Sequence, residues 1–157
     1  MRDLVTAYIG LGANLGVPQA ALLAAMDDIA ALNEVTLTRR SSLYGSAPVE
    51  SSGPDYVNAV VEVETLLTAP QLLAQLQAIE QQNGRERPYL NAPRTLDLDV
   101  LIFGESTICS VSLTVPHPRM ALRAFVLRPL AELAPERVCA ALLQSVASQA
   151  AWRLGSL

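Results

Sequence analysis

Two aspartates stand at the start of an otherwise apolar run in the second half of the chain. The segment reads Asp97-Leu98-Asp99, followed by the four apolar residues 100–103, and predicts a strand over 97–103. Successive side chains of a strand point to opposite faces, so Asp97 and Asp99 share one face, about 7 Å apart along the chain, and Leu98 lies on the other. The fold must therefore leave one end of an apolar strand beside water, a cation or hydrogen-bond donors.

This Asp pair is a candidate metal clamp. Two like charges on one face cost several kcal/mol unless a cation or matching donors neutralise them. Oxygen ligands without Cys or a second His favour Mg²⁺, which takes one or two carboxylates and completes its shell with substrate phosphates. The alternative is an ordinary strand end with carboxylates that are solvated or salt-bridged to Arg94. The residues alone leave both interpretations open.

The predicted elements alternate between strands and helices. Strands are expected over 6–11, 35–44, 56–64 and from residue 97. Helices are expected over 18–32 and from Thr68, as the N-cap, to a stop at Asn83-Gly84. The order βαββαβ predicts an α+β fold with a ferredoxin-like antiparallel sheet and helices packed on it. A C-terminal hairpin over 104–115 and short helices over 119–122, 126–134 and 140–152 follow. No linker or repeat divides the 157 residues, so one domain over 1–157 is expected.

All eleven basic residues are arginines. The absence of Lys excludes a P-loop lysine, a Schiff-base lysine and the strand lysine of protein kinases. A net charge of −4 argues against a general nucleic-acid binder. Six arginines nevertheless flank the Asp pair, which suits a small polyanionic ligand: Arg85, Arg87, Arg94, Arg119, Arg123 and Arg128.

The two cysteines, Cys109 and Cys139, match no metal or redox spacing, and we interpret them as small core residues in a reducing compartment. The chain shows no signal peptide and no apolar run of membrane-spanning length. These features predict a soluble, cytoplasmic protein.

Four further features have both a functional and a structural interpretation. Tyr56 and Asn58 share a strand face and could stack on and pair with a flat heterocycle, or simply end a strand. His117, between two prolines, could donate to a phosphate or cap the backbone. A zinc role is not expected, because no second His or Cys is nearby in the sequence. The glycines of 10–16 fail the dinucleotide spacing and indicate a tight turn in which Asn14 bonds the backbone. Loops 45–54 and 84–93 could be lids or ordinary surface loops.

Six segments in order resemble the signatures of the 6-hydroxymethyl-7,8-dihydropterin pyrophosphokinase family of folate biosynthesis. They are residues 11–16, 54–59, 79–85, 92–99, 113–118 and 123–127. The resemblance implies transfer of pyrophosphate from ATP to the pterin hydroxymethyl oxygen, release of AMP, two Mg²⁺ ions and a monomer that binds neither nucleic acid nor membrane. Departures at Leu90, Asn91, Ser112 and Pro118 affect the expected contacts of the second lid.

By this resemblance, metal binding falls to Asp97 and Asp99, and catalysis to these two with Arg87, Arg94 and His117. The implied pterin site comprises Ser46, Ala47, Pro48, Val49, Tyr56, Asn58 and Phe125. The implied nucleotide site comprises Gln77, Glu80, Arg85, Arg87, Arg94, Val100, Thr114, His117 and Arg123. Two alternatives remain at this point: a metal-dependent nucleotidyl transferase or cyclase of palm-like fold, and a regulatory domain that binds a ligand without catalysis.

Overall fold

The computed structural model describes residues 3–47, 54–83 and 96–155. Its elements in chain order are β1 (Val5–Ala13), α1 (Pro18–Ala30), β2 (Val35–Arg40), β3 (Leu43–Ser46), β4 (Tyr56–Thr65), α2 (Ala69–Gln82), β5 (Asp97–Phe103), β6 (Ile108–Cys109), β7 (Thr114–Val115), α3 (Ala124–Leu133), α4 (Ala140–Ser145) and β8 (Ala151–Gly155), with 3₁₀ turns at Met120–Leu122 and Pro135–Arg137.

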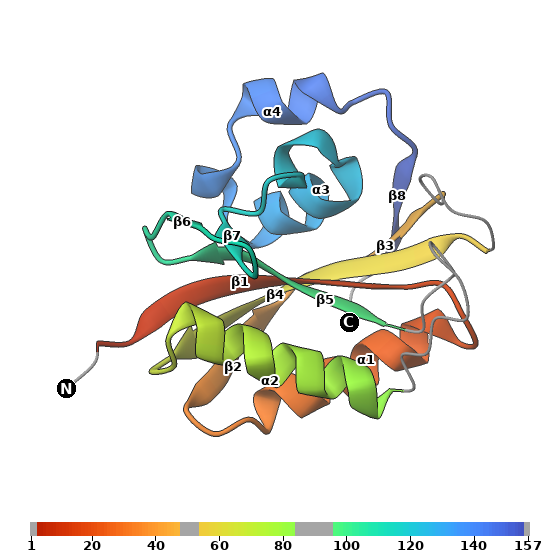
Figure 1. Cartoon of the computed structure of the whole chain (residues 1–157). Helices are drawn as coiled ribbons and strands as arrows, with labels where there is room; N and C mark the ends of the chain where they lie inside the picture. The colour runs from red at the N-terminus through yellow and green to blue at the C-terminus, as the bar shows by residue number, and fades with distance from the viewer. Residues whose placement is uncertain (1–2, 48–53, 84–95, 156–157) are drawn as a thin grey trace.

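The main sheet is antiparallel, with the strand order β5-β1-β4-β3-β8 and with β2 also paired to β4. The predicted ferredoxin-like arrangement is confirmed, and so is the predicted hairpin, in which β6 pairs with β7. Helices α1 and α2 lie on one side of the sheet, and α3 and α4 lie on the other (Figure 1). We call these sides the α1–α2 face and the α3 face.

Both faces of the sheet are buried along most of its length. On β4, Val61 and Val63 belong to the core beneath α1 and α2, whereas Val60 belongs to the core beneath α3. Helix α2 begins as predicted at Thr68, whose hydroxyl accepts the Gln71 amide while the Gln71 side chain accepts the Thr68 amide. This reciprocal cap satisfies two backbone donors that the first turn leaves without partners. No helix in the described ranges is long and apolar enough to cross a membrane.

The strand predicted over 35–44 is two strands, with Ser41 and Ser42 between them. Both serines are buried. The Ser41 hydroxyl accepts the Val60 amide at 2.9 Å, so a side chain replaces a backbone partner in the ladder with β4. Ser42 donates through its amide and its hydroxyl to Glu132 on α3. These side-chain bonds interrupt the strand at a point that its hydrophobic pattern does not mark.

The helix predicted over 140–152 is wrong in its second half. Helix α4 ends at Ser145, and Ala151–Gly155 forms β8, which pairs antiparallel with β3. A short, partly apolar segment fits either type of element by its pattern alone. Here the free edge of β3 decides the outcome. The interpretation of the cysteines as core residues is also wrong, since Cys109 and Cys139 are both exposed and unpaired.

Glu132 joins α3 to the edge of the sheet. One carboxylate oxygen accepts from Ser42, and the other accepts the Tyr44 hydroxyl at 2.7 Å. Burial by itself raises the pKa of Glu132, but the hydrogen bonds from Tyr44 and Ser42 and the charge of Arg153 outweigh burial and hold the pKa below its ordinary value. Burial and the bond to Glu132 also raise the pKa of Tyr44 to about 12.

We therefore expect Glu132→Gln to lower the free energy of unfolding by about 1 kcal/mol at pH 7, because an ionised acceptor is lost. A carboxyl group with a depressed folded-state pKa stabilises the fold above its unfolded-state pKa and loses this effect as the pH falls through the folded-state pKa. The difference between wild type and variant should thus shrink from pH 7 to pH 3 in urea titrations. Glu136→Gln, an exposed glutamate in the 3₁₀ turn after α3, is the control and should change little. An equal difference in the free energy of unfolding between wild type and Glu132→Gln at pH 7 and pH 3 would contradict the lowered pKa of Glu132 in the folded state.

Candidate functional site

The two aspartates lie at the start of β5, on the α3 face of the sheet. Asp97 is partly buried and Asp99 is exposed, whereas Leu98 between them is buried against α1 and α2. The predicted alternation is therefore confirmed. In the register with β1, Asp97 is opposite Gly12 and Asp99 is opposite Gly10. The strand beside the carboxylates thus carries no side chain at either level.

A row of cross-strand neighbours links the carboxylates to Asn58. Gly12 is opposite Asp97 on β5 and opposite Asn58 on β4, so the three residues lie side by side across the sheet. Directly opposed residues project to the same face. At ordinary strand spacing, Asp97 and Asn58 are roughly 10 Å apart. The Asp97–Gly12–Asn58 row is therefore polar at both ends and has a gap, with no side chain, in the middle.

The environment of Asn58 determines which of its atoms a ligand can use. Asn58 is 4% exposed, and its Nδ2 donates to the Ser46 hydroxyl at 2.8 Å and to the Tyr44 carbonyl at 3.4 Å. Its Oδ1 lies toward the gap, 3.2 Å from the position that a Cβ on Gly12 would take, and accepts no hydrogen bond from the described residues. Both donors of the amide are thus engaged within the protein, and the oxygen is the atom that faces the gap.

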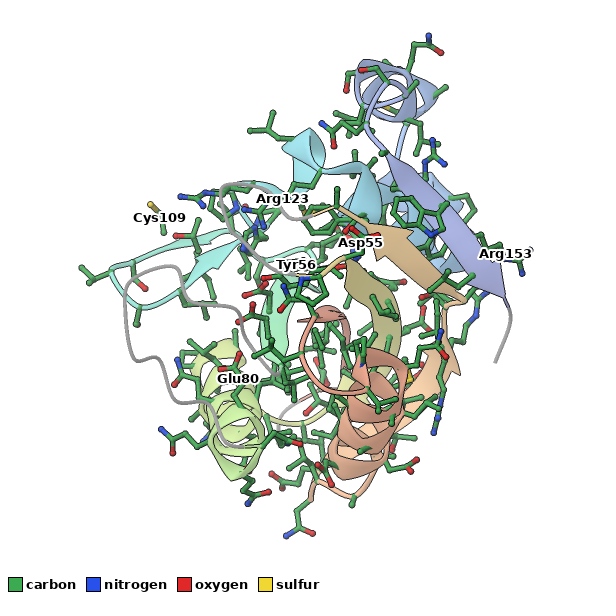
Figure 2. The ribbon with its side chains drawn as sticks, turned by 90° about the vertical axis from the view of Figure 1, so that its right-hand side faces the viewer. Asp55, Tyr56, Glu80, Cys109, Arg123 and Arg153 are labelled. Atoms are coloured by element: carbon green, nitrogen blue, oxygen red, sulfur yellow. The ribbon has the colours of Figure 1, made fainter. Side chains whose placement is uncertain are left out.

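Tyr56, Arg123 and Glu80 surround this end of the sheet. Figure 2 shows Tyr56 in the middle of the view, Arg123 on the α3 side of it and Glu80 on the α2 side. The Arg123 guanidinium lies over the Phe125 ring, 5.5 Å from its centroid, which is a cation–π contact. The structure therefore brings Arg123 and Phe125 into contact at the N-terminus of α3, before any ligand is considered.

Glu80 supports the strand that carries the aspartates. Its side chain is 3% exposed, and Oε2 accepts the amide of Leu98 at 2.8 Å. This amide belongs to the peptide group that links Asp97 to Leu98, on the terminal strand of the sheet. A buried backbone donor that has no strand partner needs an acceptor of this kind within the protein. The structure thus gives Glu80 a role in positioning the Asp pair, while its expected contact with a nucleotide remains a prediction.

A pocket of about 220 Å³ opens beside Asp99. It brings together four of the predicted site residues, Asp99, Val100, Thr114 and His117, and is completed by Leu73, Val111, Ser112, Leu113 and Pro118. Leu73 comes from α2, and the exposed Gln77 follows it by four residues on the same side of that helix. The mixture of apolar walls with one carboxylate and one imidazole suits a ligand with a flat apolar part and a charged end.

His117 is fixed by its own backbone. Its amide donates to the Leu101 carbonyl, and its Nδ1 accepts the Arg119 amide at 3.1 Å. This bond confirms the capping role and leaves Nε2 as the nitrogen that can carry the proton. Burial lowers the pKa of His117, the Asp99 charge opposes that shift, and Arg123 and Arg119 lower the pKa further. The imidazole is therefore neutral at pH 7 and can donate from Nε2.

Asn14 links the turn after β1 to the start of β4. Its Nδ2 donates to the Pro54 carbonyl at 3.2 Å, as expected of a side chain that bonds the backbone, and Oδ1 is buried without a partner in the described part of the chain.

Gly10 and Gly12 are interpreted from the sequence only as part of a turn, so their contribution to the site is missed there. Their signal was present: they alternate with the same period of two as the Asp pair.

Several predicted residues lie outside the described residues: Pro48, Val49, Arg85, Arg87, Arg94 and most of both predicted lids. Ser46 is described as a buried partner of Asn58, and Ala47 as exposed. Within 3–47, 54–83 and 96–155, no cluster of three or more His, Cys, Asp or Glu side chains could hold a metal. The Asp pair therefore fits an ion that takes few protein ligands and completes its shell with water or phosphate, as Mg²⁺ does.

A model of the 7,8-dihydro-6-hydroxymethylpterin-pyrophosphokinase family matches residues 8–135. Proteins named 2-amino-4-hydroxy-6-hydroxymethyldihydropteridine pyrophosphokinase are similar to the chain. The one from Haemophilus influenzae is 45% identical over 136 residues, 86% of this chain and 85% of that protein. The one from Pseudomonas aeruginosa is 46% identical over 130 residues, 82% of this chain and 80% of that protein.

Among solved structures, a variant of Plasmodium falciparum HPPK-DHPS has the same fold, with a TM-score of 0.71 at 14% identity. The match covers 94% of this chain and 46% of that chain. The wild-type HPPK-DHPS chain gives a TM-score of 0.64 over 84% of this chain. The chain thus spans less than half the length of these solved chains.

His117 is the only histidine, so its titration can be followed without ambiguity by NMR. We expect its pKa in the metal-free protein to lie below 6.5. Asp99→Asn should lower the pKa further, because the carboxylate favours the imidazolium, and Arg123→Gln should raise it for the opposite reason. A value above 6.5 in the wild type, or an upward shift in Asp99→Asn, would show that the described electrostatics are wrong.

Proposed function

The chain belongs to the 7,8-dihydro-6-hydroxymethylpterin-pyrophosphokinase family, and from that premise we propose which of its residues carry out the reaction. The enzyme transfers the pyrophosphoryl group of ATP to the hydroxymethyl oxygen of 6-hydroxymethyl-7,8-dihydropterin, in folate biosynthesis. The pterin oxygen forms a bond to the β-phosphorus and loses its proton, and the bond from that phosphorus to the α–β bridging oxygen breaks. AMP is the product that leaves. The two alternative classes give way to this family assignment.

The observation that carries the residue assignment is the Asp97–Gly12–Asn58 row. A planar ring fits above Gly12, where no side chain projects, with one edge at Asn58 and the opposite end toward the aspartates. Asn58 Oδ1 accepts an N–H of the pterin, while Nδ2 stays bonded to Ser46. Tyr56 and Phe125 supply aromatic surfaces for the ring, and Ser46 and Ala47 are assigned to its edge. Pro48 and Val49, which lie outside the described residues, are assigned to the pterin by family resemblance. The row thereby directs the reacting hydroxymethyl group toward the phosphates.

The nucleotide occupies the pocket beside Asp99, by the same proposal. Val100 and Thr114 contact the nucleoside, with Gln77 and Glu80 nearby on α2. His117 donates from Nε2 to a phosphate oxygen without adding a full charge, and Arg123 supplies one. Arg85, Arg87 and Arg94, which lie outside the described residues, are assigned to the triphosphate by family resemblance. An arginine-only set is consistent with bidentate binding of phosphate oxygens.

Asp97 and Asp99 hold Mg²⁺, and we assign two ions to the pair, as the family resemblance implies. Bound Mg²⁺ neutralises phosphate charge and makes the β-phosphorus more electrophilic. The protein must keep both carboxylates on one face of the sheet and in fixed positions. The hydrogen bond from the Leu98 amide to Glu80 restrains the strand that carries them. We also propose that residues 1–157 act as one monomeric domain in the cytoplasm, where free cysteines such as Cys109 persist.

The activity is tested by AMP formation from ATP and Mg²⁺, with and without the reduced hydroxymethylpterin. We expect pterin-dependent AMP in the wild type. Asp97→Asn and Asp99→Asn should each reduce turnover by several orders of magnitude, on the scale of losing an electrostatic stabiliser of the transition state. Their free energy of unfolding should stay equal or rise, because a like-charge repulsion is removed. Asp55→Asn, an exposed carboxylate near the site but off β5, is the matched control. Substantial activity in both variants would rule out the metal clamp.

Asn58→Ala should weaken pterin binding by roughly 1 to 3 kcal/mol, because a buried acceptor facing the ligand is lost, while the ATP affinity barely changes. Calorimetry with each ligand separately measures both quantities. Ser46→Ala removes the bond to Asn58 Nδ2 but leaves Oδ1 in place, so its effect on pterin affinity should be smaller. Equal losses for ATP and pterin in Asn58→Ala would show that the residue only supports the fold.

A further inference from the structure

The side chain of Gln149 makes hydrogen bonds to the backbone on both sides of Arg123. Its Oε1 accepts the Ala124 amide at 2.9 Å, and its Nε2 donates to the Leu122 carbonyl at 2.8 Å. A primary amide can do this because it offers an acceptor and donors in one plane. The backbone of Arg123 is thus held from both ends by a residue far along the chain.

The first of these bonds replaces a missing helix cap. Ala124 is the first residue of α3 and is fully buried, and Arg123 occupies the N-cap position without a side-chain capping bond. The guanidinium has only donors, so Arg123 cannot accept an amide of the first turn. Gln149 supplies the acceptor from outside the helix. The start of α3, which carries Phe125, therefore depends on the C-terminal segment.

Gln149 is itself held in place by its surroundings. Its amide donates to the Val146 carbonyl at 3.0 Å. Two residues on, Ala151 pairs with Ser46 of β3 and accepts from Arg128 at 2.8 Å. The indole of Trp152 lies against Gly45, where any Cβ would overlap it. Residues 149–152 thus join α3 to β3, and they lie beyond residues 8–135 that the family model matches.

We propose that Gln149 is a positioning residue of the active site, whose side-chain amide clamps the backbone around Arg123 and so fixes Arg123 and Phe125 relative to the Asp97–Gly12–Asn58 row. This inference rests on the proposed function, in which Arg123 binds the triphosphate and Phe125 contacts the pterin. Both side chains project from the clamped stretch of backbone, and they already touch each other. A shift of that backbone displaces the contacts of both substrates together.

The test compares Gln149→Ala, Gln149→Glu and the control Gln144→Ala in the full-length enzyme. Gln144 is an exposed glutamine of α4, in the same part of the chain, and its side chain makes no hydrogen bond in the described structure. Steady-state kinetics with each substrate varied, thermal unfolding, and hydrogen exchange of the Ala124 amide by NMR are measured for all. Kinetics are recorded at a temperature where circular dichroism shows every variant to be folded.

We expect the Ala124 amide of Gln149→Ala to exchange its hydrogen faster than in the wild type. We also expect kcat/KM to fall by about tenfold or more for both substrates, the scale of effect seen when a residue that orients a substrate-binding group is lost. Gln149→Glu keeps the acceptor for Ala124 but loses the donor to Leu122, so the helix start should stay protected while kcat/KM still falls. Gln144→Ala should match the wild type in every measurement.

The positioning role would be overturned if Gln149→Ala kept the wild-type kcat/KM although its Ala124 amide had lost protection from hydrogen exchange. Full recovery of activity in Gln149→Glu would also overturn it, because the residue would then act only as a helix cap. These failures differ from a failure of the proposed function, in which the wild-type enzyme itself forms no pterin-dependent AMP.

Discussion

The two like charges on β5 require a part of the sheet that is open to water or a ligand, and the rest of the architecture is consistent with that requirement. On the α3 face, β1, β4 and β5 each pass from side chains packed beneath α3 to small or polar residues toward the same end of the sheet. Tyr8, Val60 and Leu101 are buried beneath α3, whereas Gly12, Asn58 and Asp97 lie toward the strand ends. The apolar part anchors α3 at about 25 cal/mol for each Å² of apolar surface that is buried. We propose that the substrates bind at the polar part.

Rigidity at this site comes from hydrogen bonds within the protein. Glu80 fixes the peptide between the aspartates, Ser46 fixes the amide of Asn58, and the Arg119 amide fixes the imidazole of His117. The bonds of Asn58 and His117 each use up one hydrogen-bonding position of the side chain and thereby determine which atom remains for a ligand. Preorganised groups of this kind lower the cost of ordering the site when substrates arrive.

The electrostatics of the pocket are balanced rather than uniformly positive. Burial, Arg119 and Arg123 keep His117 uncharged, while Asp99 partly compensates. A neutral donor beside a carboxylate avoids competition with a metal cation for that carboxylate. In the proposed site, the fixed positive charge comes from the arginines, whose guanidinium groups are not deprotonated in proteins. The protein can therefore bind a polyanion without Lys and with an overall charge of −4.

The sequence by itself determined the elements whose patterns are local and strong. The alternation of Asp97, Leu98 and Asp99, the cap at Thr68 and the order βαββαβ predicted the strand face, the start of α2 and the ferredoxin-like sheet. Tertiary structure alone decided the break at Ser41, the strand state of Ala151–Gly155, the gap at Gly12 and the clamp by Gln149. Each of these depends on a partner far away in the chain, such as the free edge of β3 or the uncapped start of α3. A local pattern describes what a segment can form, and only the packed fold supplies the neighbour that selects one outcome.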